Sequence, residues 1–200
     1  SNTQGITVEI AEGLEFNRGW ISEYMMTNPK RAEAELLDVP VLVTNRRISM
    51  FKDVLPMIEE MIKKGKNSIV IIAEDIDGNA LDSFIQNKIN GAFFGLCIKA
   101  PEYGELKQNW LEDIAKTVGA TVVDDHHTFE IAHLGKAKKV LSTKDKTLLV
   151  GTAKVAEYVK ILEEQKKKLE NKYDIETMEK RIARLVGGVA IMKVGSASEE

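Results

Sequence analysis

Short apolar runs alternate with segments of helical period along most of the chain. The runs cover residues 41–44, 68–73, 93–100 and 120–123, and each is rich in Val, Ile, Leu or Phe. Runs this short and this apolar are typical of strands that are buried on both faces. The alternation predicts an α/β domain with buried mixed β-sheets in a sandwich-like arrangement, flanked by helices and completed by a C-terminal helix pair.

The first predicted helix covers residues 48–64, with Ser49 near its start and Gly65 as its stop signal. Its apolar positions fill about half of the circumference, whereas packing on a sheet needs a stripe of only ~100°. One edge of the apolar arc is therefore left for a partner. The first edge comprises Val54, Met57 and Met61, and the second comprises Leu55, Ile58 and Ile62.

A second helix with the same two-edged pattern is predicted over residues 79–89. Asp77 is its expected N-cap and Gly91 its expected stop. Its apolar positions again divide into two edges, so the two helices together predict a paired apolar surface. Ala80 and Phe84 mark one edge, while Leu81, Ile85 and Ile89 mark the other, with Lys88 between them.

The rest of the chain predicts a further helix, a hairpin and a helix pair. The helix covers residues 106–118, and the hairpin over 140–150 turns near residues 144–146. The charged segment 152–186 is helical, with a break expected at Tyr173–Asp174 and a closing strand at 189–194. The packed face of the second helix of the pair is marked by Met178, Ile182 and Leu185.

Charge and composition narrow the classes of partner. Lys and Arg number 28 against 31 for Asp and Glu, so the net charge is -3 and no basic field is available for phosphates. Hydrophobic residues make up 44%, which is enough for a packed core. No apolar stretch approaches the length of a membrane span. We therefore expect neither nucleic acid nor a membrane as a partner.

An acidic cluster offers the main candidate for chemistry. Glu74, Asp75 and Asp77 follow a predicted buried strand, where carboxylates could hold Mg²⁺ for phosphoryl transfer. The alternative is that they cap the following helix and keep the turn soluble.

Other reactive residues favour structural interpretations. His126 and His127, with His133 nearby, could ligate zinc, but adjacent residues on an extended segment point to opposite faces, which favours a polar loop. Cys97 lies in an apolar run and is expected to be a buried thiol. No phosphate-binding glycine loop and no nucleophile elbow occurs in the sequence, so we expect no catalytic residues and no bound metal or cofactor.

Seven sequence blocks resemble the apical domain of GroEL-type group I chaperonins. In chain order they are EGLEFNRGWISEY, VLVTNRRIS, LPMIEEM, IIAEDIDGNAL, IKAPEYGE, LEDIAKTVGATVV and LVGGVAIMKVGSAS. The resemblance extends from Ile10 to Ser198. It assigns residues 10–195 to the apical domain, 1–9 to a linker with an edge strand, and 196–200 to the return towards an intermediate domain.

The resemblance implies binding of non-native polypeptides and of the mobile loop of a co-chaperonin lid, in a groove between the two helices described above. Gln86 departs from the family pattern, which has an apolar residue there. Carried across by position, the groove residues are Trp20, Ser22, Tyr24, Met25, Leu55, Ile58, Leu81 and Ile85.

The resemblance also implies a larger parent protein. Gly13, Gly187 and Gly188 match the hinge between apical and intermediate domains. In this family the parent subunit forms rings of seven sibling subunits and binds ATP and Mg²⁺ in an equatorial domain. The sequence signature of that domain is absent here, so the present chain is not itself expected to be an enzyme. Its implied location is the bacterial cytoplasm, mitochondrial matrix or plastid stroma. Two alternatives stay open, a small Mg²⁺-dependent phosphoryl-transfer enzyme and a scaffold whose wide apolar helices pack against other domains of its chain.

Overall fold

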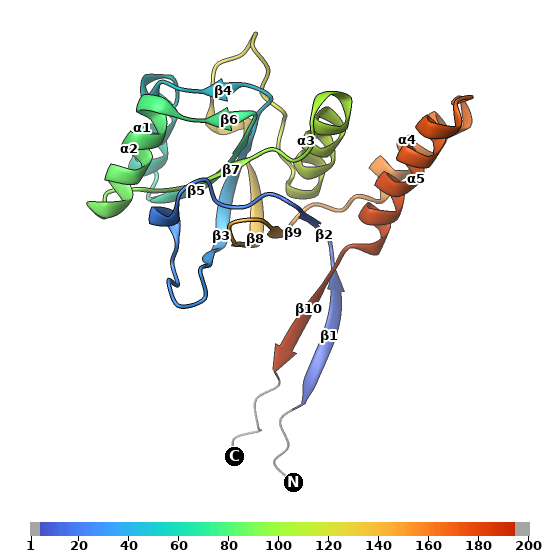
Figure 1. The fold of residues 1–200 in the computed structure, drawn as a ribbon, viewed down its shortest axis with the longest axis horizontal. Helices are drawn as coiled ribbons and strands as arrows, with labels where there is room; N and C mark the ends of the chain where they lie inside the picture. Colours follow the sequence, from blue (N-terminus) through green and yellow to red (C-terminus); the bar gives the residue numbers. More distant parts are fainter. Residues whose placement is uncertain (1–4, 195–200) are drawn as a thin grey trace.

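A computed structural model describes residues 5–194 and has a mixed six-stranded sheet at its centre (Figure 1). β3 pairs in parallel with β5, and β5 with β7, whereas the other neighbours are antiparallel. In order across the sheet, the strands are β2 (Gly13–Phe16), β9 (Thr147–Gly151), β8 (Gly135–Ser142), β3 (Ala34–Val43), β5 (Ser68–Ala73) and β7 (Phe94–Lys99).

The α/β class and three of the four predicted buried strands are confirmed. Residues 41–44 end β3, 68–73 form β5 and 93–100 contain β7. The strand predicted at 120–123 is wrong, because Val123 makes only an isolated bridge to Thr44. The hairpin β8–β9 extends the same sheet, so one main sheet stands where the sequence suggested a sandwich-like pair.

Two helices cross over between the parallel strands and lie together on one side of the sheet, at the left of Figure 1. They are α1 (Leu55–Lys63), between β3 and β5, and α2 (Gly78–Ile89), between β5 and β7. α2 matches its predicted bounds closely, and Asp77 is at its N-cap position.

The first helix is shorter than the predicted 48–64. β4 (Arg47–Ile48) pairs in parallel with β6 (Asp75–Ile76), and η2 (Phe51–Asp53) separates β4 from α1. Pro56 stands in the first turn of α1, where its missing N–H costs nothing. Ser49 does not cap the helix, because its hydroxyl donates to Asp77 at 2.5 Å.

The remaining helices lie at the right of Figure 1. They are α3 (Gly104–Val118), α4 (Ala156–Lys167) and α5 (Lys172–Gly187). The helix pair is confirmed, but its break precedes the predicted Tyr173–Asp174, because the Asn171 side chain accepts hydrogen bonds from both of those backbone N–H groups and starts α5. The predicted packed face of α5 is confirmed by the burial of Met178, Ile182 and Leu185.

A two-stranded ribbon extends away from the body (Figure 1). It pairs β1 (Ile6–Ala11) with β10 (Val189–Val194) in antiparallel fashion, so the predicted closing strand is confirmed. The assignments of residues 1–4 and 196–200 lie outside the described residues. Within residues 5–194 we find no helix with the length and apolar character needed to cross a bilayer.

Candidate functional site

The two apolar edges of α1 and α2 differ in burial. Val54, Met57 and Met61 are buried, as are Ala80 and Phe84. On the outer edges, Leu55 is 37% exposed, Ile62 48% and Ile89 59%, while Leu81 and Ile85 are partly buried against the core. We call these five outer residues the two-helix surface.

Ile58 is a correction to the predicted outer edge, since it is only 2% exposed. Val54, Ile58 and Met61 are spaced by four and three residues, which places them on one face of a helix. The buried edge of α1 therefore includes Ile58 as well as Val54, Met57 and Met61. Ile58 supports the surface from beneath and does not line it.

The segment before β3 contributes one exposed aromatic residue and one further correction. Tyr24, in η1 (Glu23–Met25), is 58% exposed, and η1 packs against α2 and β7. Met25 is fully buried, with its sulfur accepting from the Cys97 N–H, so it does not line a surface as predicted. Trp20 is partly buried and donates its indole N–H to the Ala32 carbonyl at 3.2 Å. Ser22 accepts from the Tyr24 N–H and caps η1.

Aromatic packing holds α2 beside the start of α1. The rings of Phe51 and Phe84 meet edge to face, with centroids 5.1 Å apart. The Asn79 side chain accepts from the Phe51 N–H at 2.9 Å. Phe84 lies over Gly95 of β7, where a Cβ would come within 2.5 Å of the ring. These contacts fix the outer edges of both helices on one side of the molecule.

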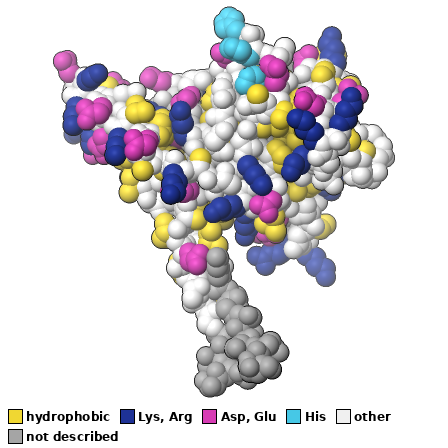
Figure 2. Space-filling model, turned by 180° about the vertical axis from the view of Figure 1, so that it is seen from behind, with side chains coloured by type: hydrophobic (Ala, Val, Ile, Leu, Met, Phe, Trp, Pro, Cys, Tyr) yellow, Lys and Arg dark blue, Asp and Glu magenta, His cyan; other side chains and the backbone are white. Residues whose placement is uncertain are grey.

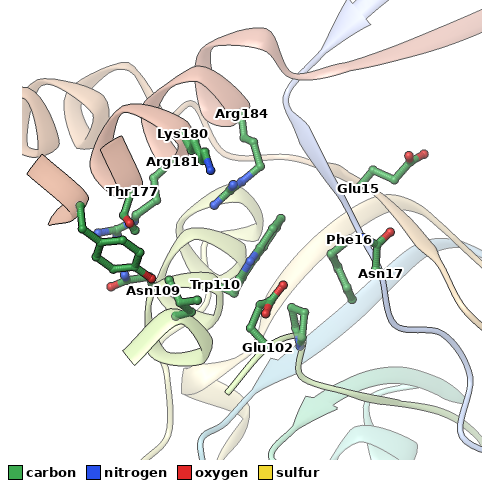
Figure 3. Close-up of a pocket in the computed structure, with 13 residues that line it drawn as sticks. Glu15, Phe16, Asn17, Glu102, Asn109, Trp110, Thr177, Lys180, Arg181 and Arg184 are labelled. Carbon is green, nitrogen blue, oxygen red and sulfur yellow. The ribbon is translucent and has the colours of Figure 1, made fainter. Parts of the chain in front are cut away.

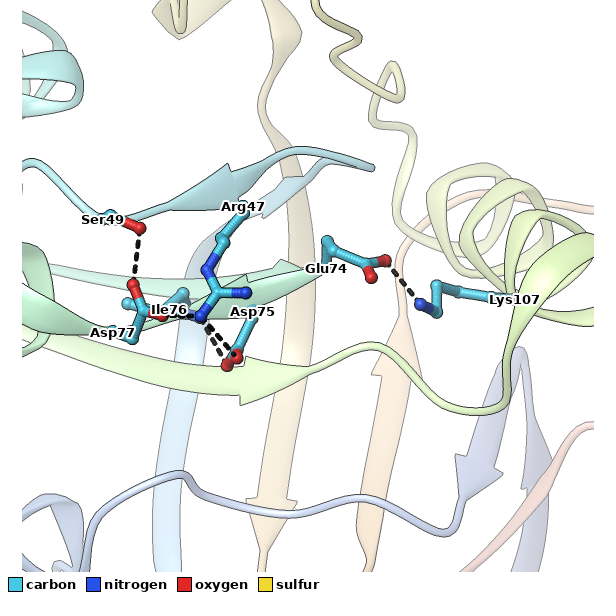
Figure 4. A network of polar contacts seen from close by, with 7 residues as sticks. All are labelled: Arg47, Ser49, Glu74, Asp75, Ile76, Asp77 and Lys107. Atoms are coloured by element: carbon cyan, nitrogen blue, oxygen red, sulfur yellow. Dashed lines mark hydrogen bonds and ion pairs between the residues drawn. The ribbon is translucent and has the colours of Figure 1, made fainter.

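All three carboxylates of the acidic cluster after β5 form ion pairs with basic side chains (Figure 4). Glu74 accepts from the Lys107 ammonium group at 2.5 Å. Asp77 binds both Arg47 and Ser49, and Asp75 lies 3.8 Å from Arg47. Hydrogen bonds from Arg47 first and Ser49 second lower the pKa of Asp77. This arrangement favours the structural interpretation over Mg²⁺ binding.

His126 and His127 lie on an exposed loop, whereas His133 ends η3 (Ile131–His133) and is partly buried; together they form the cyan group at the top of Figure 2. His127 pairs with Asp124 at 2.7 Å, and its ring meets that of His133 with centroids 6.2 Å apart. The hydrogen bond from His127 lowers the pKa of Asp124, with a smaller contribution from the His126 N–H. Among the described residues, no group of three His, Cys, Asp or Glu side chains is arranged to hold a metal ion.

Cys97 is fully buried in β7, which confirms the interpretation as a strand thiol. Burial raises the pKa of this thiol far above its ordinary value. A nucleophilic role would need a thiolate, which this environment disfavours.

The predicted hinge glycines lie where the ribbon joins the body, and two of them are tightly enclosed. A Cβ on Gly13 would lie 2.4 Å from the Leu149 carbonyl oxygen. Gly188 has φ 61°, and a Cβ there would lie 2.3 Å from the Ala11 oxygen. Gly187, at the end of α5, has no atom within 4 Å of that position. A hinge motion at this junction stays a prediction.

Sequence reasoning missed a buried polar cluster between the helices. Arg181 of α5 binds both carboxylate oxygens of Asp113 in α3, at 3.1 and 2.9 Å, and the Tyr158 hydroxyl of α4 donates to the same carboxylate at 2.7 Å. Arg181 and Tyr158 lie 68 and 45 positions from Asp113 in the chain, so no local pattern marks the pairing.

A comparison of the sequence with protein-family models finds no match.

Proposed function

We propose that this chain is the apical, polypeptide-binding domain of a GroEL-type group I chaperonin. In this proposal the two-helix surface binds apolar segments of non-native polypeptides and the mobile loop of a co-chaperonin. The observation that carries it is that α1 and α2 each bury one apolar edge while Leu55, Ile62 and Ile89 stay exposed. The seven sequence blocks supply the family to which such a surface would belong.

The physical basis of binding would be removal of apolar area from water. Each Å² of apolar surface that is buried contributes roughly 25 cal/mol, without demanding a particular sequence or direction. A surface of Leu and Ile side chains on two helices therefore suits clients that share only exposed apolar segments. Tyr24, beside α2, would extend this surface with an amphipathic ring.

The rim of the surface has polar character at Gln86. This exposed residue donates from its side-chain amide to Asn90 at 3.1 Å, one turn along α2. Clients reaching this rim would meet an amide pair and not an apolar side chain. We therefore expect the apolar contact to be concentrated on Leu55, Ile62 and Leu81.

In the same proposal, this chain is one domain of a larger parent subunit. Rings of seven such subunits, ATP and Mg²⁺ would belong to that parent, and so would a location in the bacterial cytoplasm, mitochondrial matrix or plastid stroma. The ribbon β1–β10 would lead to its intermediate domain, with Gly13 and Gly188 at the junction.

Binding of a reduced, carboxymethylated protein that cannot fold tests the proposal directly. Leu55→Ser and Leu81→Ser each remove an apolar side chain, and we expect each to weaken binding by about tenfold. Ile161→Ser is the matched control, because Ile161 is 54% exposed on α4, away from the surface. Circular dichroism checks that every variant is folded. Equal affinities for all three variants and the unaltered chain would refute the proposed site.

A further inference from the structure

A cleft lies between α3, α5 and the end of β2 (Figure 3), in the part of the molecule away from α1 and α2 (Figure 1). Its volume is about 440 Å³, and a second hollow of about 480 Å³ continues it along the helices. Both volumes fall in the range of roughly 300–1,000 Å³ that small-ligand sites occupy. The residues shared by the two hollows are Leu106, Asn109, Tyr173, Thr177 and Arg181.

The wall of this cleft holds an arginine with unused donors. The Arg184 guanidinium stacks on the Trp110 ring, 4.1 Å from its centroid. Its Nε is buried and has no hydrogen-bond partner among the described residues. Within residues 5–194, no carboxylate oxygen lies within ion-pair distance of Arg184 or of Lys180, which lines the same cleft. By contrast, Arg181, one turn earlier, is fully engaged by Asp113.

The buried Nε–H of Arg184, which has no acceptor among the described residues, carries an energetic cost. Burial lowers the pKa of Arg184, although arginine stays charged at every physiological pH. A buried donor without an acceptor loses the hydrogen bonds that water would supply. Stacking on Trp110 restricts the plane of the guanidinium, and Arg184 lines the cleft, where a planar carboxylate is the acceptor that best matches guanidinium donors.

Glu102 stands at the rim of the same cleft in a strained backbone conformation. Its φ is 64°, in the left-handed region that residues other than glycine seldom adopt. Such strain is often found at binding sites. Its carboxylate faces the cleft without forming an ion pair to Arg184 (Figure 3). The Glu102 carboxylate would therefore repel an anion that enters the cleft and compete with it for Arg184.

We propose that this cleft is a carboxylate-binding site. Arg184 binds the carboxylate edge-on, Lys180 adds a second positive charge, and the apolar body of the ligand lies along Leu106 and Tyr173. The carboxylate belongs either to a small organic acid or to an Asp or Glu side chain of a protein segment. This site is separate from the two-helix surface and does not depend on its function.

Nuclear magnetic resonance with the ¹⁵N-labelled chain tests the site. We expect 4-phenylbutyrate to shift the Arg184 Nε–H and Trp110 indole signals in a saturable manner, while the neutral 4-phenylbutyramide binds about tenfold more weakly. Arg184→Gln loses the difference between acid and amide. Arg31→Gln is the matched control, because Arg31 is exposed and lies before β3, and it leaves the difference unchanged. Glu102→Gln removes the competing charge and strengthens acid binding by about two- to fivefold.

A second arm of the experiment identifies the source of the carboxylate. The blocked peptide acetyl-Leu-Glu-Leu-amide is compared with its glutamine counterpart by the same two signals. Preference for the glutamate peptide alone assigns the site to a protein segment, and preference for 4-phenylbutyrate alone assigns it to a small acid. The proposal is overturned if acid and amide bind equally, if Arg31→Gln has the same effect as Arg184→Gln, or if neither probe shifts these signals at up to about 20 mM.

Discussion

At the scale of single residues, the buried carboxylate of Asp113 has the largest predicted effect on stability. It is 1% exposed and is shared between Arg181 and the Tyr158 hydroxyl, whose pKa is raised by burial first and by Asp113 second. Asp113→Ala leaves the Arg181 guanidinium buried without a counter-ion. We expect the free energy of unfolding to fall by about 3–5 kcal/mol, measured by urea denaturation.

The control for this substitution is a pair of the same chemistry on the surface. Glu33→Ala breaks the pair with Arg31, whose side chain is 71% exposed, and should change the free energy of unfolding by less than about 1 kcal/mol. A similar small loss for Asp113→Ala would mean that the cluster contributes little to the packing of α3 against the helix pair.

Cys97, the chain's one cysteine, reports on opening of the core. Because burial raises the pKa of its thiol, little thiolate exists in the folded protein at pH 8. We expect a thiol reagent such as Ellman's reagent to react at least about 100-fold more slowly in buffer than in denaturing urea. Rapid reaction of the folded chain, followed by absorbance, would show that β7 opens locally.

At the scale of elements, the position of α2 depends on a glycine in the neighbouring strand. A Cβ on Gly95 would overlap the Phe84 ring, which is fully buried and packs on Phe51. Gly95→Ala should therefore displace α2 and lower the free energy of unfolding by about 1–3 kcal/mol. Under the proposed function it should also weaken binding of the unfolded protein at the two-helix surface. Urea denaturation and the client-binding assay measure the two effects.

Gly187→Ala is the matched glycine control. Gly187 ends α5 with open space around its Cβ position, so alanine there should be neutral or should stabilise by up to about 1 kcal/mol. If Gly95→Ala were equally harmless, the contact between Phe84 and β7 would not be what positions α2.

Helical period divided the apolar positions of α1 and α2 into two edges, because that period is a local property, but only the resemblance indicated which edge faces outward. The edges that contain Val54 and Phe84 are buried, and Ile58, which the resemblance assigned to the groove, is buried as well. Helical period also extended the first helix too far towards the N-terminus. Ile48 instead pairs with Ile76 in a parallel bridge, and a pairing across 28 residues leaves no periodic signal in either segment.

At the scale of the whole molecule, the features that the sequence concealed are those that join distant segments. The Asp113–Arg181 pair and the cleft beside Trp110 both require α5 to lie against α3. The sequence predicted each of these helices, but helical period does not determine which helices meet. By contrast, the apolar arcs of α1 and α2 are a local feature of the sequence, and the role of these helices as a client surface stays a prediction.

The ribbon β1–β10 should be the least stable part of the sheet structure. Ile6, Val8 and Ile10 are 66%, 62% and 68% exposed, so the ribbon buries little apolar area, and an isolated pair of strands is marginal in water. By contrast, β5 is paired on both sides and buried along nearly its whole length. We expect the amide hydrogens of β1 to exchange at least about 100-fold faster than those of Val70 and Ile71 in β5, measured by hydrogen exchange. Equal protection of the two strands from exchange would mean that the ribbon and the body unfold as one cooperative unit. In that case, any rotation about Gly13 and Gly188 would have to move the ribbon as an intact pair of strands.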